Sequence, residues 1–160
     1  MLILGIDPGT TIIGYSVIEI KKSGLNLIDY GCIYTTPNSP EEEKLVQIGE
    51  DINTLIKRWR IEKAAIEDLF FTNNAKTAIK VAQARGVLIK ELASKGIEIH
   101  SYTPPQIKSA ICGYGKADKK MVQKMVQMIL NLKEIPKPDD AADAIACGIC
   151  LANSIKMTIR

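Results

Sequence analysis

The sequence predicts an α/β protein built on one mixed five-stranded sheet, with three antiparallel strands, then parallel strands, and helices on both faces. Two observations support this fold class. The first 35 residues hold three strand-like segments joined by short connections, as in an antiparallel meander. After residue 39, segments with helical periodicity alternate with two short apolar segments, which is typical of parallel strands joined by helices.

The first predicted strand covers residues 2–7 and ends in a carboxylate. Its apolar residues do not alternate with polar ones, so we expect neighbours on both faces of the sheet. A charge at Asp7, on the tip of a buried strand, costs desolvation unless it is solvated, paired or bound to a cation. Alternatively, Asp7 is a turn residue that accepts hydrogen bonds from the amides of Gly9 and Thr10. Asp7 alone does not separate these readings.

The next elements also follow from local signals. Two further strands are expected at 14–21 and 25–35, separated by a turn. A helix follows, with Ser39 as the N-cap and Pro40 at its first position. Its apolar residues recur every three or four positions, which gives the helix one buried face. They are Leu45, Ile48, Ile52, Leu55 and Trp59.

The second half alternates strands with helices. The fourth strand, 64–67, ends in Glu67, and the fifth is expected at 97–102. A long helix lies between them and ends at Gly96. Three more helices are expected at 104–112, from Asp118 to about 129, and from about 139 onward. The last is apolar nearly all round, so we expect it to pack deep against the sheet.

Four carboxylates are predicted to converge. Asp7 and Glu67 both end central strands, and ligand sites in α/β sheets lie beyond the carboxyl ends of such strands. Asp140 and Asp143 are three residues apart, which places both on one face of the last helix. Helix-dipole stabilisation is an alternative role that explains Asp140 well but Asp143 poorly, because Asp143 lies beyond the cap among alanines.

An all-oxygen cluster suits hard cations such as Mg²⁺ or Mn²⁺. Two such ions, roughly 4 Å apart, form the usual clamp for in-line attack on a phosphodiester. No histidine is then required, and His100, the sole histidine, lies in the middle of a predicted strand. We treat Asp68 and Asp139 as bystanders, since Asp68 should point to the face opposite Glu67.

A basic stretch and an aromatic pair are candidates for nucleic-acid contact. The segment 104–125 holds five lysines against one acid, with Tyr114 between two glycines. The lysines are Lys108, Lys116, Lys119, Lys120 and Lys124. A solvated helix face is the alternative, but beside a metal site we favour contact with a phosphate backbone, with Lys119 stabilising charge at the phosphate. Of the neighbours Phe70 and Phe71, one is expected to pack and the other to meet unstacked bases.

Four motifs in register carry a resemblance to the RuvC family of Holliday-junction resolvases, over essentially the whole chain. They are Gly5-Ile6-Asp7-Pro8-Gly9-Thr10 with Gly14, Ile66-Glu67 with Phe70 and Asn74, Gln83-Ala84-Arg85-Gly86, and Asp140-Ala-Ala-Asp143-Ala144. The resemblance implies a ribonuclease-H-like fold and a homodimer that cuts two opposed strands of a four-way DNA junction with divalent metal. It also implies products with 5′-phosphate ends and a branch-migration complex like RuvA–RuvB as partner.

Residue roles carry over by position. Asp7, Glu67, Asp140 and Asp143 match the family's metal-binding catalytic acids, so two Mg²⁺ ions per site are expected, with Mn²⁺ able to substitute. Lys108 and Lys119 match basic residues near the scissile phosphate, and Phe70 matches an aromatic residue that contacts unstacked bases. Departures from the family pattern are the short tail and the cysteines Cys147 and Cys150, where some relatives carry histidines.

The bulk properties agree with this reading. A chain of 160 residues with a net charge of +3 predicts one nuclease domain spanning 1–160. Four cysteines give no disulfide framework, and no signal peptide or membrane segment is evident, so a soluble cytoplasmic protein is expected. Gly86, inside a helix, costs about 1 kcal/mol relative to alanine, which indicates close packing, such as helix against helix across a dimer.

Two rival functions remain. Asp7-Pro-Gly-Thr10 also resembles the first phosphate loop of actin-like ATPases, but those need two lobes around a nucleotide, and 160 residues are too few. A catalytically silent nucleic-acid-binding relative is the other rival, although a binder would gain by losing acids near phosphates. The prediction is therefore a dimeric, magnesium-dependent, structure-selective endonuclease without a nucleotide cofactor or a membrane partner.

Overall fold

The computed structural model describes residues 1–69 and 75–158. Phe70, Phe71 and Asn74 lie outside the described residues, so the predictions made for them stay predictions. Within the described ranges, no helix is long and apolar enough to cross a membrane.

The strands form one five-stranded sheet in the order β3-β2-β1-β4-β5. Their bounds are β1 Leu2–Asp7, β2 Ile12–Lys21, β3 Gly24–Tyr34, β4 Lys63–Glu67 and β5 Glu98–Tyr102. The pairs β1–β2 and β2–β3 are antiparallel, and the pairs β1–β4 and β4–β5 are parallel. The predicted mixed sheet is confirmed, and β1 and β4 are its adjacent parallel central strands.

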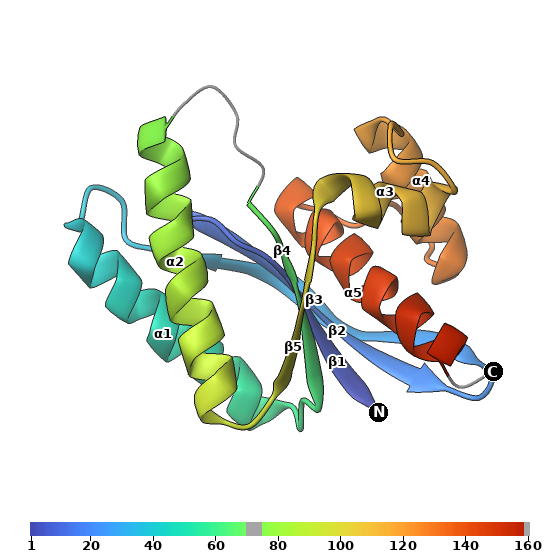
Figure 1. The fold of residues 1–160 in the computed structure, drawn as a ribbon, viewed down its shortest axis with the longest axis horizontal. Coiled ribbons are helices and arrows are strands. Elements are labelled where there is room, and N and C mark those ends of the chain that lie inside the picture. The colour runs from blue at the N-terminus through green and yellow to red at the C-terminus, as the bar shows by residue number, and fades with distance from the viewer. Residues whose placement is uncertain (70–74, 159–160) are drawn as a thin grey trace.

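Helices cover both faces of this sheet (Figure 1). The helices α1 Glu41–Arg58 and α2 Ala75–Ser94 pack on one face, on the left of the view. The helices α3 Pro104–Cys112, α4 Lys119–Ile129 and α5 Asp139–Thr158 lie on the other. The strand β1 lies between two apolar cores, because Ile3 faces the core of α5 while Leu4 and Ile6 face that of α1 and α2. All three side chains are 0% exposed, as the unbroken apolar run of β1 predicts.

The start of α1 differs from the prediction. The residue before the helix is Pro40, and no side chain caps it. The Ser39 hydroxyl donates instead to the Thr36 carbonyl at 2.9 Å, inside the preceding turn. The N-cap prediction for Ser39 was therefore wrong, because a turn acceptor competes for the hydroxyl. In α4, by contrast, the predicted opening residue Asp118 accepts a hydrogen bond from the Met121 amide at 2.8 Å.

The last helix lies unusually close to the sheet. A Cβ atom on Gly5 would overlap the carbonyl oxygen of Ala144, and one on Gly14 would overlap that of Asp140. The buried hydroxyl of Ser16 donates to the same Ala144 carbonyl at 2.9 Å. Because glycines occupy the sheet beneath it, α5 can bring its first turn directly over the ends of β1 and β2.

Candidate active site

A pocket of about 290 Å³ opens at the carboxyl ends of β1 and β4. Ile6 pairs with Ile66 in the parallel register, so the next residues, Asp7 and Glu67, are neighbours at this edge. Asp143 reaches the pocket from α5. The structure therefore gathers three of the four predicted acids around one cavity. The lining residues are Asp7, Glu67, Pro104, Ile107, Lys108, Lys119, Val122, Asp143 and Ala146.

Burial, and to a smaller extent neighbouring charges, raises the pKa values of all three acids. Burial, followed by the charges of Glu67, Asp143 and Asp140, raises the pKa of Asp7 to about 8. Burial and Asp143 raise the pKa of Glu67 to about 7, against the lowering effect of Lys108 and Lys119. Burial also raises the pKa of Asp143, although Lys119 lowers it. Negative charge in this pocket is thus only partly balanced by the protein itself.

The fourth acid, Asp140, lies at the margin. It does not line the cavity, although its charge contributes to the raised pKa of Asp7. The charge of Asp140 also raises the pKa values of Cys32 and Tyr34. For Cys32 the larger cause is burial. For Tyr34 the larger cause is the neighbouring Cys32 thiol. Because the Asp140 carbonyl oxygen lies against Gly14 of β2, Asp140 is located between β1 and β3.

Lys119 provides a positive charge inside the acid cluster. Its ammonium lies 3.1 Å from Asp143 Oδ2 and 3.2 Å from Asp139 Oδ2. Gln123, also on α4, donates to Asp139 Oδ1 at 3.0 Å. Asp139 is outside the pocket, but it is not a bystander, because it holds the lysine from the far side. No local sequence pattern predicts this contact, because α4 meets the start of α5 only through tertiary packing.

The donor set fits a hard cation by its chemistry. All the acids offer oxygen ligands. The raised pKa values of Asp7, Glu67 and Asp143 show that their ionised forms are disfavoured without an added positive charge, which a cation would supply. Within residues 1–69 and 75–158, however, no three histidine, cysteine or acidic side chains lie close enough as they stand to hold an ion. Binding would therefore require the carboxylates to turn toward the ion, with Asp143 exchanging its contact with Lys119.

Arg85 of α2 supports the site from behind. Its Nε donates to the Glu67 carbonyl at 3.3 Å, and its Nη2 donates to Ser101 Oγ at 2.7 Å and lies 3.3 Å from Asp68 Oδ1. The Asp68 carboxylate also accepts from the Leu69 amide at 2.9 Å. Asp68 does not line the pocket, but the prediction that it is a bystander overlooked this clamp. With a side chain only 17% exposed, Arg85 fixes the end of β4, where Glu67 begins.

The remaining predicted contacts lie elsewhere. Lys116, Lys120 and Tyr114 are exposed around the connection between α3 and α4 and do not line the pocket. Their contact with DNA stays a prediction. Cys147 and Cys150 are buried in α5, as expected for core residues, and burial raises the pKa of both thiols.

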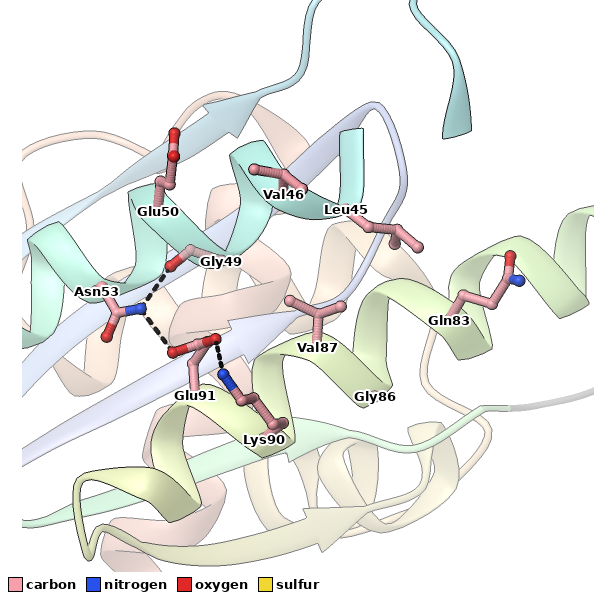
Figure 2. Close-up of a pocket in the computed structure, with 10 residues that line it drawn as sticks. All are labelled: Leu45, Val46, Gly49, Glu50, Asn53, Gln83, Gly86, Val87, Lys90 and Glu91. Atoms are coloured by element: carbon pink, nitrogen blue, oxygen red, sulfur yellow. Dashed lines mark hydrogen bonds and ion pairs between the residues drawn. The ribbon is translucent and has the colours of Figure 1, made fainter. Parts of the chain in front are cut away.

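A larger pocket, of about 660 Å³, lies on the opposite side of the sheet between α1 and α2 (Figure 2). Its polar groups bond to one another: Asn53 donates to Gly49 O at 2.9 Å and to Glu91 Oε2 at 2.6 Å, and Lys90 lies 2.7 Å from Glu91 Oε1. The buried Asn53 Oδ1 has no partner among the described residues, but no group of acids faces the groove as in the smaller pocket. On volume alone this groove would be the candidate active site, but the cluster of acids lines the smaller pocket.

Carboxylates at the ends of adjacent central strands, with a further acid from the helix packed on the sheet, are the arrangement expected for a nuclease with a ribonuclease-H-like fold. The family model described as crossover junction endodeoxyribonuclease RuvC matches residues 3–151. The chain belongs to the RuvC family. The crossover junction endodeoxyribonuclease RuvC of Desulfitobacterium hafniense is 48% identical over 160 residues, which cover 100% of this chain and 97% of the relative.

Solved structures agree with this assignment. A Thermus thermophilus RuvC structure has a TM-score of 0.90 and 34% identity, covering 99% of this chain and 97% of that one. The T. thermophilus RuvC in complex with a Holliday junction substrate has a TM-score of 0.88 and 32% identity, covering 98% and 96%. The ribonuclease-H-like fold expected from the sequence is thereby confirmed.

Proposed function

We propose that this protein is a dimeric, magnesium-dependent endonuclease that cuts four-way DNA junctions, with residues 1–160 as one nuclease domain. The observation that carries the proposal is the pocket in which Asp7, Glu67 and Asp143 meet Lys108 and Lys119, in a chain of the RuvC family. The same family includes a T. thermophilus protein in complex with a Holliday junction substrate. A branch-migration complex like RuvA–RuvB is proposed as partner on family membership alone.

The acids would hold the catalytic metal. Asp7, Glu67, Asp140 and Asp143 supply the carboxylates for two Mg²⁺ ions, with Mn²⁺ able to replace them. Bound ions of this kind activate a water for attack on phosphorus and stabilise the leaving oxygen. The protein's part is to direct the acids into the pocket, where a bound cation would favour their ionised forms. Hydrolysis in this arrangement is proposed to leave a 5′-phosphate and a 3′-hydroxyl.

The lysines of the pocket act on the DNA. The Lys119 ammonium, already 3.1 Å from Asp143, is placed to stabilise the charge that develops on the scissile phosphate. Lys108 lines the same wall from α3 and would bind an adjoining phosphate oxygen. Phe70, Lys116, Lys120 and Tyr114 remain proposed DNA contacts outside the pocket, on the resemblance and their charge or aromatic character.

Acid substitutions separate catalysis from binding. Glu67→Gln and Asp143→Asn should each lower single-turnover junction cleavage at least about 100-fold, because each removes a metal ligand. Junction affinity measured in chelator should stay within about threefold, since the acids do not bind phosphate directly. The matched control is Glu134→Gln, an exposed acid between α4 and α5. Normal cleavage by the pocket variants would contradict the proposed site.

The groove between α1 and α2 is the proposed dimer surface. Val46 of α1 and Ile79 of α2 are 61% and 60% exposed. A Cβ added to Gly86 would meet no described atom within 4 Å, so packing within the described chain does not explain this costly glycine. Figure 2 shows Val46, Leu45 and Val87 along the groove beside Gly86. A second copy covering this face would bury these apolar groups around a twofold axis.

Sedimentation velocity tests the dimer. Val46→Asp should shift the protein toward monomer, because a buried charge would replace an apolar contact. Met128→Asp is the matched control, since Met128 is 64% exposed on α4, across the sheet from the groove. An unchanged dimer in the Val46 variant would place the interface elsewhere.

A further inference from the structure

Two exposed apolar side chains border the active site at the end of β3. Ile12 begins β2 and Tyr34 ends β3, and the two residues are a cross-strand pair. Ile12 is 36% exposed and Tyr34 is 57% exposed. Single exposed apolar residues are common, so the position of this pair beside the pocket, rather than its exposure, indicates a contact.

The pair lies on the same face of the sheet as the catalytic acids. The register places Asp7 opposite Gly14, and Gly14 opposite Cys32, so these three residues form one row across β1, β2 and β3. Side chains alternate between faces along a strand, so Ile12 and Tyr34 form the next row on the same face, about 7 Å further out.

Asp140 lies between the pocket and this pair. Its backbone carbonyl rests over Gly14, in the row beneath the pair. The side chains of Tyr34 and Cys32 hydrogen-bond, and the pKa of Tyr34 is raised mainly by Cys32 and to a smaller extent by burial and by the charge of Asp140. The tyrosine is therefore close enough to Asp140 for that charge to act on it.

The backbone at Tyr34 is held in place. Gln47 of α1 donates to the Tyr34 carbonyl at 3.0 Å. The next residue, Thr35, donates its hydroxyl to the Thr10 carbonyl at 2.8 Å and its amide to the Thr11 carbonyl at 3.1 Å. These bonds tie the end of β3 to α1 and to the loop that follows Asp7. The ring is thus presented on a fixed support beside the site, which lowers the entropy cost of a contact.

We propose that Tyr34, with Ile12 beside it, forms the contact surface for the nucleotide adjacent to the scissile phosphate, on the side away from Lys108 and Lys119. This inference rests on the proposed function. A DNA strand whose phosphate occupies the pocket continues on both sides of the acids. The lysines suit a phosphate on one side, whereas on the other side Asp140 would repel one. The face of a base or a deoxyribose suits an exposed aromatic ring, and such stacking tolerates any base.

Tyr34→Ala tests the contact, with two matched controls. We expect kcat/KM for junction cleavage to fall roughly 5- to 50-fold in Tyr34→Ala and to stay within about twofold in Tyr34→Phe, because stacking needs the ring and not the hydroxyl. Tyr30→Ala should also stay within about twofold. Tyr30 is 39% exposed on the same strand and pairs with Ser16, on the α5 face. It lies four residues, about 13 Å, further from the site.

An altered substrate identifies the partner group. Removing the base at each nucleotide flanking the cut should weaken cleavage by the wild-type protein at one of these positions. The same abasic junction should lower cleavage by Tyr34→Ala little further, because this variant has already lost the stacking contact. Fully additive losses, or wild-type activity in Tyr34→Ala, would overturn the inference while leaving the nuclease intact. A wild-type protein that binds but never cuts would instead overturn the proposed function.

Discussion

Asp7→Asn should inactivate the protein and yet stabilise its metal-free fold. The side chain is held at the end of β1, where burial and the charges of Glu67, Asp143 and Asp140 raise its pKa to about 8. Asparagine is nearly isosteric but cannot ionise. The substitution therefore removes a metal ligand and, without metal, also removes a charge that the fold tolerates poorly.

The size and sign of the effect follow from proton linkage. An aspartate in the unfolded chain ionises near pH 4, whereas Asp7 in the folded chain ionises near pH 8. Between these values the folded state holds the proton more tightly, so the wild type loses stability as pH rises. Each pH unit is worth about 1.4 kcal/mol, which gives at most about 4 kcal/mol at pH 7. Water in the open pocket makes the loss of stability smaller than this limit, and we expect Asp7→Asn to stabilise the metal-free protein by about 2 kcal/mol at pH 7.

Urea unfolding in chelator at pH 5 to 8.5 measures the effect. The Asp7→Asn variant should show a smaller loss of unfolding free energy with rising pH than the wild type, and the two should converge toward pH 4. The slope should not vanish, because the pKa of Glu67 is also raised, to about 7. Added magnesium should raise the unfolding free energy of the wild type more than that of the variant, because the variant lacks one metal ligand. Glu134→Gln, at an exposed acid, should follow the wild-type curve.

An Asp7→Asn variant whose pH profile of unfolding free energy matches that of the wild type would contradict the raised pKa of Asp7. It would mean that Asp7 is solvated in the folded state and that the acids do not crowd one another. Full nuclease activity in Asp7→Asn would refute the assignment of the metal site itself.

Three further predictions concern the surroundings of the acids. Lys119→Met should lower single-turnover cleavage about 100-fold with little change in junction affinity, because the ammonium acts mainly on the transition state. Arg85→Lys should lower the unfolding free energy by about 1–2 kcal/mol in urea, since an ammonium cannot reproduce the forked contacts behind Glu67. Gly5→Ala should lower the unfolding free energy by about 3 kcal/mol or more, because the added Cβ would overlap α5. As a contrast, Gly86→Ala on α2 should raise the unfolding free energy of the isolated chain by up to about 1 kcal/mol, because its Cβ would enter open space.

Periodicity predicted most of the fold. The unbroken apolar run before Asp7 indicated a strand buried on both faces, and the apolar character of the last helix indicated its deep packing. Both are properties of a short stretch, visible without knowing its neighbours. The failed N-cap at Ser39 shows the limit, because which acceptor wins the hydroxyl depends on the turn that precedes it.

The site was only partly predictable. Strand ends predicted the meeting of Asp7 with Glu67, but the clamp from Arg85 to Asp68 joins segments whose contact no local pattern encodes. The same holds for the bond from Lys119 to Asp139, because Asp139 was expected to be a bystander. Contacts of this kind depend on how the helices pack against the sheet and against one another, and that packing is determined by the hydrophobic core as a whole.

The proposed function is best tested by cleavage of a synthetic four-way junction beside a linear duplex of the same sequence, with magnesium and with chelator. We expect paired, symmetric nicks in the junction only, and only with magnesium. Junction binding without nicks in magnesium or manganese would contradict it and indicate a silent binding protein on a nuclease fold.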